Sequence, residues 1–286
     1  MQKVTFYSHG ARVAGVLRLP PSGPPCAAVV MCAGMTLTKE VWLPANADWL
    51  CARGYATLSF DYRGFGESEG PRLRLVPAMQ VEDVRAALTF LETLPSIDSA
   101  RLGLFGVSLG ASVAVATAGV DSRVKATIAV AGPMDLGRVW RAFPGFEGFH
   151  AKVSSARQKA VASGEFSFIK LSRLLAGDTA TASKIEQDAA GIPQWRPEVS
   201  FESLADLFEF RPEAVVAQIS PRAVMFVAPE DDELVAQGEL RSAFALAGEP
   251  KRFVMLPGVK HHEVYGEGKG FAQTMESSAA FLGDYL

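Results

Sequence analysis

One serine of this chain stands in a sequence context that could make its hydroxyl a nucleophile. Ser108 is the centre of the pentapeptide Gly-Val-Ser-Leu-Gly, residues 106–110, which fits the pattern Gly-x-Ser-x-Gly. Glycines on both sides let the backbone pass close to the serine in a strained turn between a strand and a helix. The pentapeptide alone is as compatible with a serine that caps a helix, so the chemistry depends on what else the chain supplies.

A serine hydroxyl is a poor nucleophile at neutral pH and needs a neighbouring base that a carboxylate holds in place. Two later segments carry such groups: Pro-Glu-Asp-Asp-Glu at 229–233 and Pro-Gly-Val-Lys-His-His at 257–262. Each follows an apolar run of strand length, and the order along the chain is serine, acid, histidine. This coincidence is far more specific than the pentapeptide alone, and it predicts a Ser–His–Asp triad.

Alternating strand and helix patterns must bring these three loops together. Polar–apolar alternation predicts an antiparallel hairpin over 4–8 and 11–19, and short apolar runs then alternate with apolar stripes of helical spacing. Such an order predicts a doubly wound, mostly parallel α/β sheet, whose working site lies beyond the carboxyl ends of the strands. The predicted strands are 27–32, 56–60, 101–107 and 126–131, and the predicted helices are 42–53, 79–94 and 111–118.

The alternation stops in the middle of the chain. Residues 136–212 lack a convincing buried strand but contain helical runs at 154–162 and 166–175, which predicts an inserted helical cap rather than a loop. The chain therefore divides into a first part of the core, 1–135, the cap, and a second part of the core, 213–286. That second part has predicted strands at 223–228 and 253–256 and predicted helices at 233–247 and 271–286.

At these residues the sequence resembles the alpha/beta-hydrolase superfamily, and within it the dienelactone-hydrolase-like and peptidase-like esterases that carry a cap before the acid. The resemblance covers both parts of the core. Its motifs are the pentapeptide around Ser108, Asp-Tyr-Arg-Gly-Phe-Gly-Glu-Ser at 61–68, Pro-Glu-Asp-Asp-Glu-Leu-Val at 229–235 and Gly-Val-Lys-His at 258–261. The resemblance implies the alpha/beta-hydrolase fold and a serine hydrolase activity.

The family pattern selects between neighbouring acids and between neighbouring histidines. In relatives a valine follows the acid after two to three residues, which favours Asp232 over Asp231. The histidine stands three residues after the glycine, which favours His261 over His262. Both unchosen neighbours stay open, and so does Asp135, which follows a strand end but is otherwise expected to cap the first helix of the cap.

An oxyanion needs two backbone donors. One is expected from the N–H of Leu109, directly after the serine, and the resemblance implies the N–H of Met35 as the other. The chain departs from the family where Ala33 replaces the usual histidine and where Ala111 replaces a second glycine. A backbone donor survives a change of side chain, so the expectation stands. Cys32 beside this segment is expected to pack in the core.

Aromatic side chains recur every three residues at the start of the cap. One interpretation makes them an apolar, substrate-binding lining for an acyl or aryl group. The commoner fate of such residues is the core of the cap itself or its seam against the sheet, and Pro144 and Gly145 interrupt the helix between them. The four residues are Trp140, Phe143, Phe146 and Phe149.

Composition excludes several other classes of protein. The 286 residues carry a formal net charge of −3 and no Lys/Arg-rich run, which argues against a nucleic-acid partner. The longest apolar run, 27–35, is far shorter than a membrane span, and the first ten residues lack a signal-peptide core, so a cytoplasmic location without membrane contact is expected. Three irregularly spaced cysteines predict neither disulfides nor a zinc site, and no metal or organic cofactor is expected.

Together these features predict a serine hydrolase that cleaves an ester, thioester or related acyl bond, a carboxylic ester being the first expectation. Ser108 would attack, His261 would move the proton, and Asp232 would orient His261. An acyltransferase, a carbon–carbon bond hydrolase with the same triad, and a non-catalytic binding protein on this scaffold stay open. The expected partner is a small, apolar acyl substrate, and a homodimer stays open.

Overall fold

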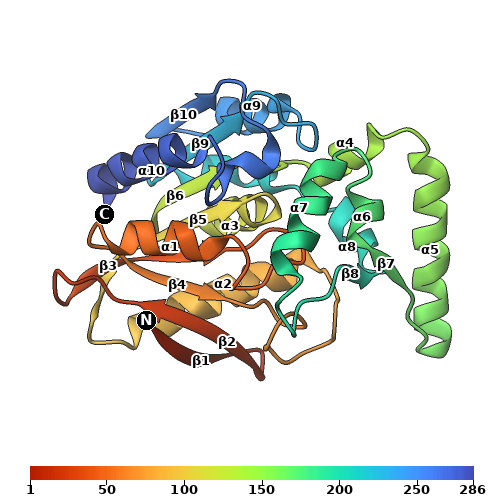
Figure 1. Ribbon diagram of the computed structural model, residues 1–286, viewed down its shortest axis with the longest axis horizontal. Coiled ribbons are helices and arrows are strands. Elements are labelled where there is room, and N and C mark those ends of the chain that lie inside the picture. The colour runs from red at the N-terminus through yellow and green to blue at the C-terminus, as the bar shows by residue number, and fades with distance from the viewer.

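The protein is described by a computed structural model of residues 1–286, built around one eight-stranded sheet (Figure 1). The first two strands form an antiparallel hairpin at one edge, and all later strands are parallel to one another. This confirms the predicted doubly wound α/β class. In sheet order the strands are β1 (Gln2–Ser8), β2 (Ala11–Arg18), β4 (Ala56–Phe60), β3 (Cys26–Cys32), β5 (Ile97–Val107), β6 (Val124–Val130), β9 (Ala223–Pro229) and β10 (Lys251–Leu256).

Helices cover both faces of the sheet, which is why its inner strands are apolar throughout. Every residue of β3, β4 and β9 is buried, as continuous apolar runs predict for parallel strands. The helices α2 (Pro77–Glu92), α3 (Leu109–Val120) and α9 (Gln237–Leu246) pack on one face, and α1 (Leu43–Cys51) and α10 (Phe271–Tyr285) pack together on the other. None of the helices combines the length and apolar character that spanning a bilayer requires.

Two boundaries in the core differ from the prediction by four residues, and the others differ by two or fewer. The strand β5 begins at Ile97 rather than at residue 101, because its first residues form a polar, mostly exposed extension. The helix α9 begins at Gln237 rather than at residue 233, because residues 230–236 form a loop in which a carboxylate receives backbone N–H groups. The residues predicted to start this helix instead belong to the loop that carries the predicted acid Asp232.

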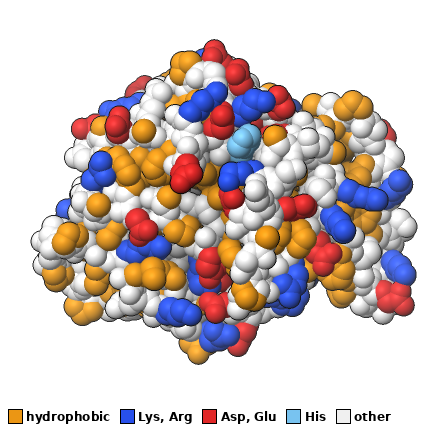
Figure 2. Space-filling view, in the orientation of Figure 1, with side chains coloured by type: hydrophobic (Ala, Val, Ile, Leu, Met, Phe, Trp, Pro, Cys, Tyr) orange, Lys and Arg blue, Asp and Glu red, His pale blue; other side chains and the backbone are white.

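The inserted segment lies at one end of the sheet, on the right in Figure 1. The long helix α5 is mostly exposed, with Val153 as its one buried residue. On the face drawn in Figure 2, basic and acidic side chains are interspersed with apolar ones. The elements of the segment are α4 (Leu136–Arg141), α5 (Phe146–Ser163), β7 (Phe168–Lys170), α6 (Leu171–Leu174), α7 (Thr179–Ala189), β8 (Glu198–Ser200) and α8 (Leu204–Phe208).

The prediction of one helix over 166–175 was wrong in its first half. Residues 168–170 form the strand β7, which pairs antiparallel with β8 and places Ile169 opposite the buried Val199. Aromatic and β-branched side chains favour such a paired, half-buried surface, and a run this short gives no helical period to oppose it. Only the second half, from Leu171, is helical.

The chain leaves the core for this segment and returns to it at adjacent points. The N–H of Leu136 donates to the carbonyl of Phe210 at 3.1 Å, so the outgoing and returning backbones are hydrogen-bonded side by side. The guanidinium of Arg138 then bonds both carboxylate oxygens of Glu213, at 2.8 and 2.9 Å, and also those of Glu239 on α9. One arginine thus ties both ends of the insertion to the core.

Candidate active site

The serine of the pentapeptide lies in a sharp turn between β5 and α3. Ser108 has φ 56° and ψ −129°, a backbone conformation that residues with side chains rarely adopt. A Cβ at Gly106 would lie 2.2 Å from the carbonyl oxygen of Gly110, and a Cβ at Gly110 would lie 2.1 Å from that of Cys32. Both glycines are therefore required for space. Ser108 is the residue directly before α3, and the turn directs its hydroxyl away from the sheet.

The structure brings Ser108, His261 and Asp232 into one hydrogen-bonded chain. The Oγ of Ser108 lies 3.1 Å from Nε2 of His261, and Nδ1 of His261 lies 2.8 Å from Oδ2 of Asp232. The imidazole and the carboxylate are almost completely buried, at 2 and 1% side-chain exposure. Because a carboxylate only accepts, Nδ1 carries the proton, and Nε2 is left to accept from the serine.

The loop after β9 explains why Asp232 reaches the histidine. Its Oδ1 accepts the backbone N–H groups of Leu234 and Val235, at 2.9 and 2.8 Å, which fixes the carboxylate and leaves Oδ2 for His261. Asp231 is exposed, and its side chain does not contact the histidine. The geometry therefore favours Asp232, the acid that the family pattern preferred, over Asp231.

The other two alternatives lie elsewhere. Nδ1 of His262 is 3.3 Å from Oγ1 of Thr181 on α7, so this histidine turns toward the inserted segment. Asp135 accepts the N–H of Arg138 at 2.8 Å and caps α4, which confirms the capping expectation for it. Neither side chain reaches Ser108.

Both predicted oxyanion donors belong to segments that lie next to the serine. Leu109 is the first residue of α3, where backbone N–H groups have no partner within the helix. The N–H of Met35 donates to no other group of the protein, and the Cβ position of Gly34 is 3.4 Å from Cβ of Ser108. Cys32 is fully buried, and burial raises the pKa of its thiol to about 12, as a core residue requires.

A buried lysine that the sequence analysis missed supports the loop with Met35. The ammonium of Lys39 lies 2.7 Å from a carboxylate oxygen of each of Glu40, Asp61 and Glu67, and its backbone N–H donates to Asp61 at 2.8 Å. Burial alone would lower the pKa of Lys39, but the charge of Asp61 and the hydrogen bonds to all three carboxylates raise it overall. The lysine occupies the centre of these carboxylates and joins the loop to the end of β4.

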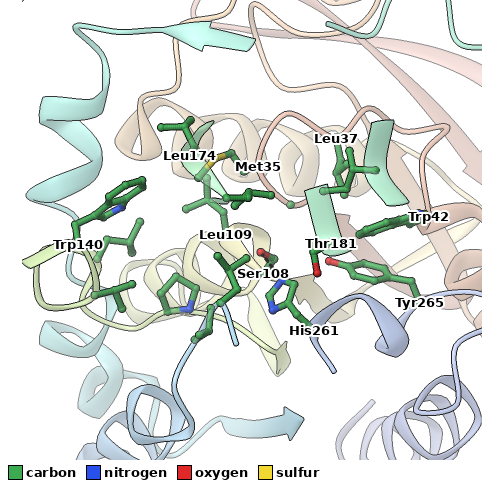
Figure 3. A pocket seen from close by; sticks show the side chains of 18 of the residues that line it. Met35, Leu37, Trp42, Ser108, Leu109, Trp140, Leu174, Thr181, His261 and Tyr265 are labelled. Carbon is green, nitrogen blue, oxygen red and sulfur yellow. Dashed lines mark hydrogen bonds between the residues drawn. The ribbon is translucent and has the colours of Figure 1, made fainter. Parts of the chain in front are cut away.

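A mostly apolar cavity adjoins the serine. It is narrow, with about 60 Å³ available to the centres of water-sized molecules, and 14 of its 19 lining residues are hydrophobic. In Figure 3, Ser108 and His261 lie between two ends of this cavity. We call them the Trp140 end, with Trp140 and Phe143, and the Tyr265 end, with Leu37, Trp42, Thr181 and Tyr265.

Only two of the four predicted lining aromatics line this cavity. Trp140 and Phe143 do, whereas Phe146 and Phe149 pack against Phe208, with ring centroids 5.4 and 6.2 Å away. The reason is the break between α4 and α5, which redirects the chain and turns the later rings into the inserted segment. The lining prediction is therefore corrected for these two residues. The sequence analysis also missed lining residues from α1, α6, α7 and the histidine loop: Trp42, Leu174, Leu175, Thr181, Ile185 and Tyr265.

Comparisons with known proteins agree with this fold. The model of the alpha/beta hydrolase family matches residues 29–274. A polyketide transferase of Stachybotrys chlorohalonatus is 30% identical over 279 residues, 89% of each chain, and a thiohydrolase of Aspergillus aculeatus is 27% identical over 291 residues, 97% of this chain and 91% of its own. The crystal structure of an alpha/beta hydrolase from Penicillium sp. sh18 shares the fold, with a TM-score of 0.85, 24% identity and coverage of 99 and 98%.

Proposed function

The chain belongs to the alpha/beta hydrolase family, and from that premise we propose that it is a serine hydrolase that cleaves an ester or thioester through an acyl-enzyme on Ser108. The observation that carries this proposal is the hydrogen-bonded chain from Ser108 through His261 to Asp232 at the wall of an apolar cavity. A relative named thiohydrolase supports the bond class.

The geometry suits the acyl-transfer mechanism of serine hydrolases. In the first step Ser108 attacks the carbonyl carbon while Nε2 of His261 accepts the hydroxyl proton, and Asp232 stabilises the resulting imidazolium. The N–H groups of Leu109 and Met35 hold the oxyanion. His261 then donates the proton to the leaving oxygen or sulfur. A water activated by the same histidine releases the acid and restores the serine.

Acyl transfer is the second candidate, because two relatives are named polyketide transferase and acyltransferase. The same acyl-enzyme would serve, with an alcohol, thiol or carbon nucleophile in place of water. The apolar cavity favours such an acceptor, since few polar groups are present to order a water. A carbon–carbon bond hydrolase or a non-catalytic binding protein finds no specific support in the site.

The test is covalent labelling combined with burst kinetics. We expect a fluorophosphonate probe to label the wild-type protein at Ser108 and p-nitrophenyl butyrate to give a burst of about one equivalent of nitrophenol. Ser108→Ala is expected to abolish both. The control is Ser112→Ala, one turn along α3, whose hydroxyl donates to the carbonyl of Pro133 and lies outside the cavity.

The products then separate the two candidates. Added ethanethiol or butanol diverts an acyl-enzyme from acid to thioester or ester, and a transferase is expected to favour these products at low acceptor concentration. A folded wild-type protein that neither reacts with the probe nor turns over any ester or thioester would contradict both candidates.

A further inference from the structure

One polar group at the Tyr265 end has no partner in the protein. Tyr265 is 4% exposed, and its hydroxyl makes no hydrogen bond to any other residue. The residue lines the cavity, and Figure 3 shows the hydroxyl pointing inward, toward the side where Thr181 and His261 lie. A buried hydroxyl without a partner is unfavourable, and native structures rarely keep one without a reason.

The Tyr265 ring is held in place by its neighbours. The indole of Trp42 packs against it with ring centroids 4.1 Å apart, and the indole N–H donates to Asp188 of α7 at 2.6 Å. Trp42 itself has φ 64°, a strained conformation that persists only where the surroundings enforce it. Because the ring cannot easily turn, the hydroxyl is fixed before any ligand binds.

The other polar groups at this end are already paired. The hydroxyl of Thr181 donates to Asp178, and its oxygen faces Nδ1 of His262 at 3.3 Å. Since the hydroxyl of Thr181 has one proton, that proton is used. Burial, and then the charge of Asp232, hold the pKa of Tyr265 well above its ordinary value, so its hydroxyl stays protonated and can donate.

The Trp140 end has the opposite character. Its rings, Trp140 and Phe143, have centroids 5.9 Å apart, and the neighbouring wall is formed by Leu136, Val139 and Leu174. A substrate that passes Ser108 therefore meets hydrocarbon on one side and one fixed hydrogen-bond donor on the other. Matching that donor requires an oxygen on an otherwise apolar skeleton.

We propose that the hydroxyl of Tyr265 donates a hydrogen bond to a keto or hydroxyl oxygen on the acyl chain of the substrate, so that oxygenated acyl groups are selected over plain hydrocarbon ones. The inference rests on the proposed function, because it assumes that the acyl group lies in this cavity. The inference also places the acyl group at the Tyr265 end and the leaving group at the Trp140 end.

The first experiment compares two tyrosine variants. Substrates are N-acetylcysteamine thioesters of decanoic acid and of its oxo derivatives with the keto group at the third, fifth or seventh carbon. At one keto position at least, wild-type kcat/KM is expected to exceed that for the plain chain by about tenfold, and Tyr265→Phe should bring this ratio close to one. The control, Tyr62→Phe, also removes a buried, unpartnered hydroxyl, but from a site outside the cavity, and should leave the ratio unchanged.

A second experiment measures binding without turnover. In the Ser108→Ala background, calorimetry compares decanamide with its oxo derivatives, and the same preference and the same loss in Tyr265→Phe are expected. Equal binding of plain and oxygenated amides, or a preference that survives in Tyr265→Phe, would overturn the inference. Labelling of Ser108 tests the proposed function independently of this result. Absent labelling and turnover with an intact binding preference would overturn only the proposed function.

Thermal unfolding separates a binding role from a structural one. Tyr265→Phe breaks no hydrogen bond within the protein, so its melting temperature is expected to equal or exceed that of the wild type. A lower melting temperature together with an equal loss of activity on plain and oxygenated substrates would show that the hydroxyl is structural, and would overturn the inference.

Discussion

The core and the inserted segment contribute different parts of the site. The core carries the serine, the histidine, the acid and both predicted oxyanion donors next to strand ends, and every residue of β3, β4 and β9 is buried. The segment 136–212 contributes 8 of the 19 residues that line the cavity, and in its longest helix, α5, Val153 alone is buried. The reacting groups thus all belong to the core, whereas the wall that meets the substrate is shared between the core and the segment, whose outer helix α5 is lightly packed.

The largest expected effect tests the embedded region with adjacent histidines. His261→Ala is expected to lower kcat by about a million-fold, as removal of the base does in other serine triads. His262→Ala, the next residue, loses only its contact with Thr181 and is expected to keep most of the activity. Both are measured with p-nitrophenyl butyrate. Comparable losses of kcat in the two variants would contradict this division, because catalysis would then also depend on the contact of His262 with the inserted segment.

Adjacent acids give the next test. Asp232→Asn should lower kcat by about ten-thousand-fold, because the amide favours the wrong histidine tautomer, while Asp231→Asn at an exposed position should change kcat little. Circular dichroism confirms that both variants fold. A severe loss in the second variant, with the first still active, would reassign the acid.

A stability measurement sharpens the contrast between the regions. Lys39→Met leaves three carboxylates without their cation and should lower the free energy of unfolding by about 3–5 kcal/mol in urea denaturation. In the inserted segment, Lys159 and Glu165 form an ion pair with both side chains about two-thirds exposed. Lys159→Met should therefore cost less than about 1 kcal/mol. Equal costs would show that the segment is as tightly held as the core.

The smallest effect concerns the walls. Phe143→Ala enlarges the Trp140 end, where the leaving group is expected, and should shift the kcat/KM ratio between esters of long and short alcohols by about tenfold. Phe146→Ala removes a ring that packs on Phe208 instead, so it should leave this ratio unchanged. An equally strong change in Phe146→Ala would mean that substrate contacts extend beyond the residues that line the cavity in the structure.

The same division explains what the sequence could predict. The strands of the core are continuous apolar runs, and the Ser108 turn is a local pattern of glycines, so both were predicted to within a few residues. The role of Lys39 could not be, since it depends on Asp61 and Glu67 arriving from a distant loop. Tyr265 gave no signal either, because its hydroxyl becomes informative only once its lack of partners is known.

The inserted segment was harder to predict for a related reason. Its elements are short and partly exposed, so the run 166–175 had no period strong enough to separate β7 from α6. The direction of Phe146 and Phe149 likewise depends on the angle between α4 and α5, which spacing alone does not give. The division into 1–135, 136–212 and 213–286 itself stays a prediction.

The paired backbones where the chain leaves and re-enters the core have an evolutionary consequence. Because Leu136 and Phe210 are hydrogen-bonded neighbours, the intervening residues form an excursion whose two ends meet. We expect that a stretch anchored in this way can be exchanged for another of different length, provided that the contact of Thr181 with the histidine loop is kept. Chimaeras joined at these two positions, and at the Arg138 anchor, are a natural route to new selectivity by recombination between relatives.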